Sequence, residues 1–159
     1  MQNSEAGWCC SLDDGNGLWY TEKYPEDMFF EHWTIMAGRY KSNPLVIGAD
    51  LRNEVRGITE EDGTVTYALW GSGRVEQDWK QAAEEAGRRV LAANPDMLVI
   101  VGGIIYGNVL TPAWWAPIQM PKQVTIMKSS EWQLLHMSGN YIAGKIGLYR
   151  PYLPIYTSI

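Results

Sequence analysis

The sequence predicts an α/β fold made of parallel β-α units, in the form of an incomplete (β/α)8 TIM barrel. Two apolar runs without polar alternation, residues 45–51 and 97–101, have the pattern of strands buried on both faces of a parallel sheet. A segment with helical periodicity precedes each run, and this alternation is typical of parallel sheets. The connections from helix to strand are short, whereas the segments after the strands are long. That asymmetry indicates a barrel whose functional groups lie at the carboxyl ends of its strands.

The first predicted helix covers residues 25–41. Pro25 and the two acidic residues after it suit a first helical turn, and Asn43-Pro44 ends the helix. Apolar side chains recur on one face, at Phe29, Trp33, Met36, Ala37 and Tyr40. The lone His32 on this helix is expected at the surface or at the boundary of the core.

The second predicted helix covers residues 77–94 and has the clearest periodicity in the chain. Its apolar face contains Trp79, Ala83, Ala86 and Val90. Glutamates 84 and 85 lie four residues before arginines 88 and 89, the spacing that supports ion pairs along a helix.

The segments outside these units carry weaker signals. Residues 57–76 are expected to form a long loop, and the Gly71-Ser72-Gly73 within it is discounted as a phosphate loop because it lacks the rest of that motif. Residues 124–127 could form another strand. We therefore divide the chain into a barrel-like domain, residues 1–127, and a divergent tail, residues 128–159, that is expected to be poorly ordered.

Length, charge and composition restrict the class of protein. A chain of 159 residues suits one domain, and a net charge of -5 without a basic cluster argues against nucleic-acid or anionic-membrane partners. No apolar stretch has the roughly 18 residues that a membrane span needs. The first five residues lack the basic start and apolar run of a signal peptide, so the sequence leaves open a cytosolic protein or an internal piece of a longer one.

Aromatic usage is uneven, with 8 Trp and 9 Tyr but only 2 Phe. Tryptophan and tyrosine combine a flat apolar face with a polar edge, which suits half-wet surfaces such as those that stack on sugar rings. A core rich in tryptophan explains the same composition equally well, so both interpretations stay open.

The two cysteines, Cys9 and Cys10, are neighbours in the sequence. Two adjacent thiols cannot complete a tetrahedral zinc site, and a disulfide between neighbours would be strained. They are interpreted as buried thiols, with a vicinal disulfide or pairing to cysteines outside this chain as alternatives. No metal and no cofactor is expected.

The candidate functional residues come after the first predicted strand. Within seven positions the apolar run gives way to charged and amide groups, at Asp50, Arg52, Asn53, Glu54 and Arg56. Because α/β folds keep their chemistry at the carboxyl ends of buried strands, we interpret Glu54 as one half of a catalytic carboxyl pair.

With its flanks, this strand resembles glycoside hydrolase family 5, the cellulase-type (β/α)8 barrels. The resemblance covers about residues 5–120. It rests on the segment from Arg39 to Pro44, on that from Val46 to Glu54, on the helix from Asp78 to Gly87 with the strand after it, and on Gly7-Trp8-Cys9-Cys10 together with Asp14-Gly15-Asn16-Gly17.

The resemblance implies a retaining hydrolase of β-linked polysaccharides such as cellulose, β-glucan or mannan, and implies secretion, although the residues themselves leave the localisation unknown. It implies that Glu54 is the general acid/base and that Asn53 bonds to the sugar 2-hydroxyl beside the scissile bond. We further predict that Trp8, Arg52, Trp70 and Tyr106 contact the substrate.

The chain also departs from the family. The nucleophile of the family is a second Glu on a later strand, but beyond residue 94 the acidic residues are Asp96, at the wrong end of its strand, and Glu131, in a segment unlike the nucleophile strand. We therefore expect a piece covering about strands 3/4 to 5/6 of the barrel, without its nucleophile. Such a piece is expected to lack turnover and to self-associate through exposed barrel edges. The alternatives are a non-catalytic carbohydrate-binding remnant, using Trp8, Trp19, Trp70 and Trp114-Trp115, and a fragment without function.

Overall fold

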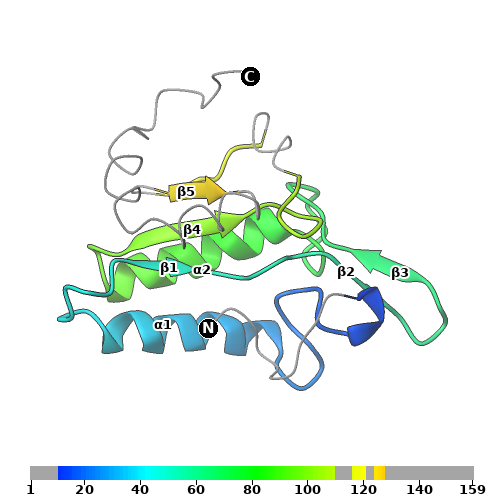
Figure 1. Ribbon diagram of the computed structural model, residues 1–159, viewed down its shortest axis with the longest axis horizontal. Coiled ribbons are helices and arrows are strands. Elements are labelled where there is room, and N and C mark those ends of the chain that lie inside the picture. Colours follow the sequence, from blue (N-terminus) through cyan, green and yellow to red (C-terminus); the bar gives the residue numbers. More distant parts are fainter. Residues whose placement is uncertain (1–10, 110–115, 121–123, 128–159) are drawn as a thin grey trace.

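The structure is a computed structural model, and it describes residues 11–109, 116–120 and 124–127. Within these residues a short 3-10 helix, η1, precedes two α-helices and five strands (Figure 1). In chain order the elements are η1 (Leu12–Asp14), α1 (Glu26–Arg39), β1 (Gly48–Asp50), β2 (Gly57–Thr59), β3 (Val65–Tyr67), α2 (Trp79–Ala93), β4 (Leu98–Gly102) and β5 (Val124–Met127). Both predicted helices and the strand at residues 124–127 are confirmed.

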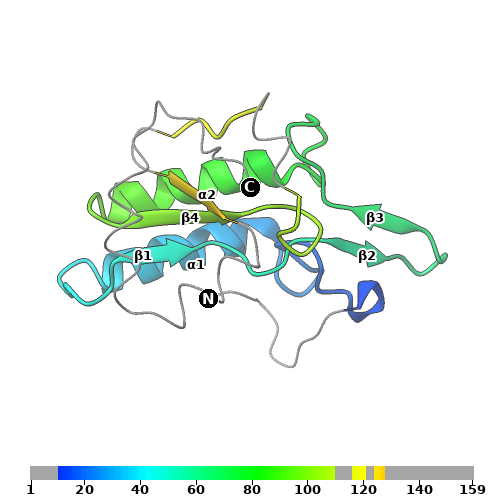
Figure 2. The same cartoon turned by 45° about the horizontal axis from the view of Figure 1, so that its top comes forward.

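The main sheet is parallel, as the alternating pattern predicts. Its order is β1-β4-β5, with Ala49 opposite Val99 in the first pair and Ile100 opposite Thr125 in the second. Both α-helices lie behind the sheet in the view of Figure 2, so they cover one of its faces. Ala49, Val99 and Val101 are buried, and the residues between them in the strands are only partly buried. The core of the described residues therefore lies between the helices and one face of the sheet.

The prediction that residues 45–51 form a strand buried on both faces is wrong. The strand is short, Gly48–Asp50, and before it Leu45 and Ile47 are 88% and 56% exposed. Among the described strands β1 lies at the edge of the sheet, with β4 as its one neighbour. An apolar run therefore does not by itself show whether other elements cover both faces of a strand. Leu51, directly after the strand, is fully buried.

The prediction of a long loop over residues 57–76 is also wrong in part. β2 and β3 pair as an antiparallel hairpin, with Gly57 opposite Tyr67 and Thr59 opposite Val65. The hairpin projects away from the sheet in both Figure 1 and Figure 2. Three-residue strands with little apolar alternation leave a weak periodic signal, which explains why the sequence pattern does not reveal them.

The Gly71-Ser72-Gly73 segment holds a carboxylate of the chain itself. Asp78 is the N-cap of α2 and is only 3% exposed. Its carboxylate accepts hydrogen bonds from the backbone N–H groups of Gly71, Gly73 and Gln81, at 2.9, 2.7 and 3.3 Å. Both glycines adopt the positive φ angles that glycine tolerates without strain. The segment thus serves as a cap for α2.

Each helix contributes a tryptophan that bonds to the end of the strand after it. The indole nitrogen of Trp33, on α1, donates to the carbonyl of Leu51 at 3.1 Å. That of Trp79, on α2, donates to the carbonyl of Gly102 at 2.8 Å. These bonds satisfy the carbonyls where the sheet ladder stops, and so fix the point at which each strand gives way to its loop.

Candidate active site

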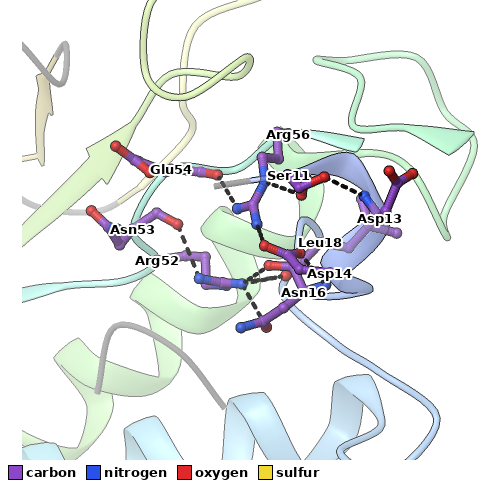
Figure 3. A network of polar contacts seen from close by, with 9 residues as sticks. All are labelled: Ser11, Asp13, Asp14, Asn16, Leu18, Arg52, Asn53, Glu54 and Arg56. Carbon is purple, nitrogen blue, oxygen red and sulfur yellow. Dashed lines mark hydrogen bonds and ion pairs between the residues drawn. The ribbon is translucent and has the colours of Figure 1, made fainter. Parts of the chain in front are cut away.

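Arg52, directly after β1, links the strand end to the segment before α1. This residue is only 2% exposed. Nε and Nη2 of its guanidinium donate to the backbone carbonyl of Leu18 at 3.0 and 2.9 Å, and Nη2 also donates to the backbone carbonyl of Asn16 at 2.6 Å. Nη1 donates to the carbonyl of its neighbour Asn53 at 3.0 Å (Figure 3). Burial and the charge of Arg56 lower the pKa of Arg52 to about 10, which still leaves it protonated at neutral pH.

Arg56 makes a second link of the same kind. It is 1% exposed, and its Nη2 forms an ion pair with Asp14 at 2.5 Å. Nε donates to the carbonyl of Ser11 and Nη1 to the carbonyl of Glu54, each at 3.2 Å. The backbone supports this contact, because the N–H of Arg56 donates to the carbonyl of Gly17 at 2.9 Å. Two buried arginines thus attach the segment from Ser11 to Leu18 to the end of β1.

Asn53 and Glu54 present their side chains in the opposite direction. In Figure 3 both side chains point away from Arg52 and Arg56, and only their backbone carbonyls turn toward the two guanidinium groups. Both residues are partly buried. Asn53 and Glu54 are thus the polar side chains at the end of β1 that remain directed outward from the network.

Glu54 adopts a left-handed backbone conformation, with a φ of 48°. This conformation costs a residue with a side chain roughly 1–2 kcal/mol, and such strain persists where surrounding contacts impose it. Here the carbonyls of Asn53 and Glu54 are held by the arginines, and that of Val55 accepts from the N–H of Tyr106 at 3.0 Å. The backbone around Glu54 is therefore fixed on several sides.

Tyr106 brings the end of β4 to the same place. Its ring lies 5.4 Å from the guanidinium carbon of Arg56, at the distance of a cation–π contact. Tyr106 and its neighbour Ile105 are both left-handed, with φ angles of 59° and 54°. The structure thus places two of the predicted substrate contacts, Arg52 and Tyr106, beside Asn53 and Glu54.

The other predicted contacts lie elsewhere or outside the described residues. Trp70 is 8% exposed, and its indole nitrogen donates to the carbonyl of Ala116 at 2.8 Å. Trp19, named in the alternative binding interpretation, is fully buried against Trp79. Trp8, with the Cys9-Cys10 pair, lies outside the described residues, as do Trp114-Trp115 and the tail. The tryptophans of the described core therefore fit the interpretation of a core rich in tryptophan.

Apart from the two arginines, the residues that hold the site in place are not among the site residues predicted from the sequence. Asp14, Asn16 and Gly17 have the character of turn residues, yet the first two bond to the arginines. A β-carbon at Gly17 would lie 1.9 Å from the carbonyl oxygen of Gly57, so only glycine fits there. In the sequence, Arg52 and Arg56 lie on either side of Asn53-Glu54. This spacing is the signal that indicates two arginines linking the end of β1 to another segment. Within the described residues, no group of three or more His, Cys, Asp or Glu gathers as metal ligands would.

This chain has a parallel β-α fold, and a carboxylate and an amide follow the end of one strand. These features are typical of α/β proteins that place their functional groups at the carboxyl ends of the strands. The sequence profile of the cellulase family (glycosyl hydrolase family 5) matches residues 5–129. The chain belongs to this family.

Individual curated proteins that are similar to this chain are also endoglucanases. An endoglucanase from Paenibacillus polymyxa is 43% identical over 101 residues, which cover 62% of this chain and 23% of the relative. A major extracellular endoglucanase from Xanthomonas campestris is 35% identical over 116 residues, covering 65% of this chain and 22% of the relative. The chain thus spans about a quarter of the length of these curated relatives.

Solved structures give the same result for the fold. An endocellulase from Pyrococcus horikoshii superposes with a TM-score of 0.62 at 31% identity, over 69% of this chain and 35% of that one. The catalytic domain of the Xanthomonas enzyme gives 0.61 at 29% identity, over 80% and 40%. Among the described residues, neither α-helix combines the length and the apolar character that a membrane crossing requires.

Proposed function

We propose that this chain carries the acid/base half of a retaining glycosidase site for β-linked glucans. Glu54 is the general acid/base, and Asn53 bonds to the sugar 2-hydroxyl. The observation that supports this most strongly is the outward direction of both side chains at the end of β1, beside a network that engages only their carbonyls (Figure 3). Membership of the cellulase family, with endoglucanases among the relatives, supports the class of substrate.

The chemistry assigns each group one task. A protonated Glu54 gives its proton to the glycosidic oxygen as the bond from that oxygen to the anomeric carbon breaks. In the second step the same carboxylate takes a proton from water, which attacks the anomeric carbon. Retention also needs a second carboxylate about 5 Å away, to attack the anomeric carbon first.

That second carboxylate limits what the 159 residues can do. Beyond Asp96 the sequence contains one acidic residue, Glu131, which lies outside the described residues. We propose that the chain binds a β-1,4-linked glucan without hydrolysing it. An added small nucleophile such as formate would take the place of the missing carboxylate on an aryl glycoside whose leaving group still requires a proton from Glu54.

The same proposal extends to architecture and location. The described β-α units represent the middle of a (β/α)8 barrel, residues 1–127 form the barrel-derived domain, and residues 128–159 form a divergent tail. Exposed apolar side chains beside the β1 edge, Leu45 and Ile47, would promote self-association. Secretion is proposed from the relative described as extracellular.

The test measures release of phenol from phenyl β-cellobioside, a poor leaving group that departs readily only when it is protonated, with and without formate. We expect release by the wild-type chain only when formate is present, because formate attacks the anomeric carbon while Glu54 protonates the departing phenolate oxygen. Glu54→Gln should abolish that release, and Glu31→Gln, an exposed carboxylate on α1, should leave it unchanged. Equal formate-dependent release by wild type and Glu54→Gln would refute the acid/base assignment.

Binding is tested separately by calorimetric titration with cellotetraose. Asn53→Ala is expected to weaken binding about threefold to tenfold, the effect of one hydrogen bond. The alternative of a stacking remnant is less well supported, because Trp19 and Trp70 are buried and their indole nitrogens donate within the chain.

A further inference from the structure

We infer that Arg52 and Arg56 are positioning residues. They hold Asn53 and Glu54 in their working geometry by donating hydrogen bonds to the backbone carbonyls of these two residues. Together with Asp14 and the segment from Asn16 to Leu18 they form what we call the arginine clamp. This inference deepens the proposed function and rests on it for the roles of Asn53 and Glu54. It assigns Arg52 a task other than the substrate contact predicted from the sequence.

The first step of the argument is the destination of each guanidinium. Arg52 donates to the carbonyl of Asn53, and Arg56 to the carbonyl of Glu54. Both arginines are nearly inaccessible, at 2% and 1% exposure. An arginine that contacts a substrate must present donors outward, whereas the donors described here reach groups of the chain itself.

The second step is the conformation that results. A strand continuing from β1 would alternate its side chains between the two faces, so Asn53 and Glu54 would point in opposite directions. Instead both point away from the arginines (Figure 3). The left-handed φ of 48° at Glu54 redirects the chain at this position. Since that conformation is unfavourable for glutamate, the hydrogen bonds to the backbone carbonyls of Asn53 and Glu54 must maintain it.

The third step is the anchor at the other end of each arginine. Arg56 is charge-paired with Asp14, and Arg52 donates to the carbonyls of Asn16 and Leu18. A planar guanidinium can reach both ends at once, whereas the single ammonium of lysine cannot. The clamp therefore couples the backbone conformation of Glu54 to the position of the segment before α1.

The first arm of the test reads the geometry by NMR of the full chain. The Cα and Cβ chemical shifts of Glu54 and its three-bond HN–Hα coupling report φ directly. Arg56→Met should move them from left-handed to extended values, and Arg56→Lys should not restore them, while the signals of Val99 in β4 stay in place. Arg89→Met, which removes an arginine that pairs with Glu85 on α2, is the matched control and should leave Glu54 unchanged.

The second arm measures cellotetraose affinity, which a merely structural role for the arginines would not alter in a folded variant. Arg56→Met should bind roughly tenfold more weakly than Arg89→Met. Should Arg56→Met fail to fold, Asp14→Asn is judged by the same two criteria. An unchanged left-handed φ in the clamp variant, or a changed φ with unchanged affinity, would overturn the inference. Failure of the wild-type chain to bind cellotetraose would instead contradict the proposed function, and the φ measurement would still decide whether the clamp exists.

Discussion

The carboxyl ends of β1 and β4 share one structural device and differ in the residues that come after it. At each end a tryptophan of the preceding helix donates to a backbone carbonyl, Trp33 to Leu51 directly after β1 and Trp79 to Gly102 at the end of β4. After β1 the chain continues into arginine, asparagine and glutamate. After β4 it continues through glycine and isoleucine into a turn closed by two hydrogen bonds between Ile104 and Val109, at 3.2 and 3.0 Å.

This difference separates the scaffold from the chemistry. The repeated tryptophan contact belongs to the β-α unit, because it ends each strand in the same way whatever the next residues are. The polar end of β1 needs further support, since charged groups and a left-handed glutamate are costly there without partners. The arginine clamp supplies that support, while the apolar end of β4 turns through the bonds between Ile104 and Val109 and contributes Tyr106 to the same place.

The largest expected effect comes from Gly17, which docks the clamp against β2. A β-carbon there would lie 1.9 Å from the Gly57 carbonyl oxygen and 2.9 Å from Cγ of Arg56. Gly17→Ala should lower the free energy of unfolding by about 3 kcal/mol, as overpacking does. Urea titration monitored by tryptophan fluorescence measures it.

The matched control for Gly17→Ala is Gly38→Ala in α1, where a β-carbon meets nothing within 4 Å. The control should gain about 0.5–1 kcal/mol, because alanine favours the helix. Equal stability of the two alanine variants would show that the segment before α1 is not packed against β2 as described.

The next effect compares the two tryptophans directly. Trp33→Phe and Trp79→Phe each leave a carbonyl at a strand end without its indole donor and should each lower the free energy of unfolding by about 2 kcal/mol. Thermal unfolding measures both. Only Trp33→Phe should also change the chemical shifts of Glu54, because only β1 leads into the clamp. Equal changes at Glu54 in the two variants would contradict the separation of scaffold and chemistry.

The sequence predicts the repeated part of this comparison better than the part unique to β1. Both helices and the parallel sheet can be predicted from apolar periodicity, which many residues carry together. The anchoring of the clamp depends instead on contacts across more than thirty positions, such as Arg52 to Asn16 at a separation of 36 residues. Local pattern contains no information on such pairing. The same reason explains why the burial predicted for Leu45 and Ile47 is wrong: apolar character does not show whether a neighbouring strand covers them.

A smaller effect tests the strain at Glu54. Glu54→Asn should raise the free energy of unfolding by about 1 kcal/mol, because asparagine tolerates the left-handed region better than glutamate. Glu54→Gln, which keeps the shape and the strain of glutamate, should show no gain, and chemical denaturation of both variants gives the comparison. A gain in the Gln variant equal to that in Asn would attribute the effect to charge rather than to backbone strain.

The smallest effect concerns an arginine–carboxylate contact within α2, and it provides a comparison for the Arg56–Asp14 pair of the clamp. Glu85 on α2 accepts from Nε of Arg89 at 2.6 Å, and this bond lowers the pKa of Glu85 against a smaller opposing effect of burial. Because the folded-state pKa is lowered, the contact stabilises the fold above the ordinary glutamate pKa and is lost as the pH falls through the lowered value. Solvent screening limits it to a few tenths of a kcal/mol, so Glu85→Gln should cost that much at pH 7 and nothing once the pH has fallen below the lowered pKa. Asp14→Asn, which breaks the pair with the buried Arg56, should cost several times more at pH 7 in the same urea titrations. If the two substitutions cost the same, the buried pair would contribute no more than a surface pair, and the clamp would lose the anchor through which it holds Glu54.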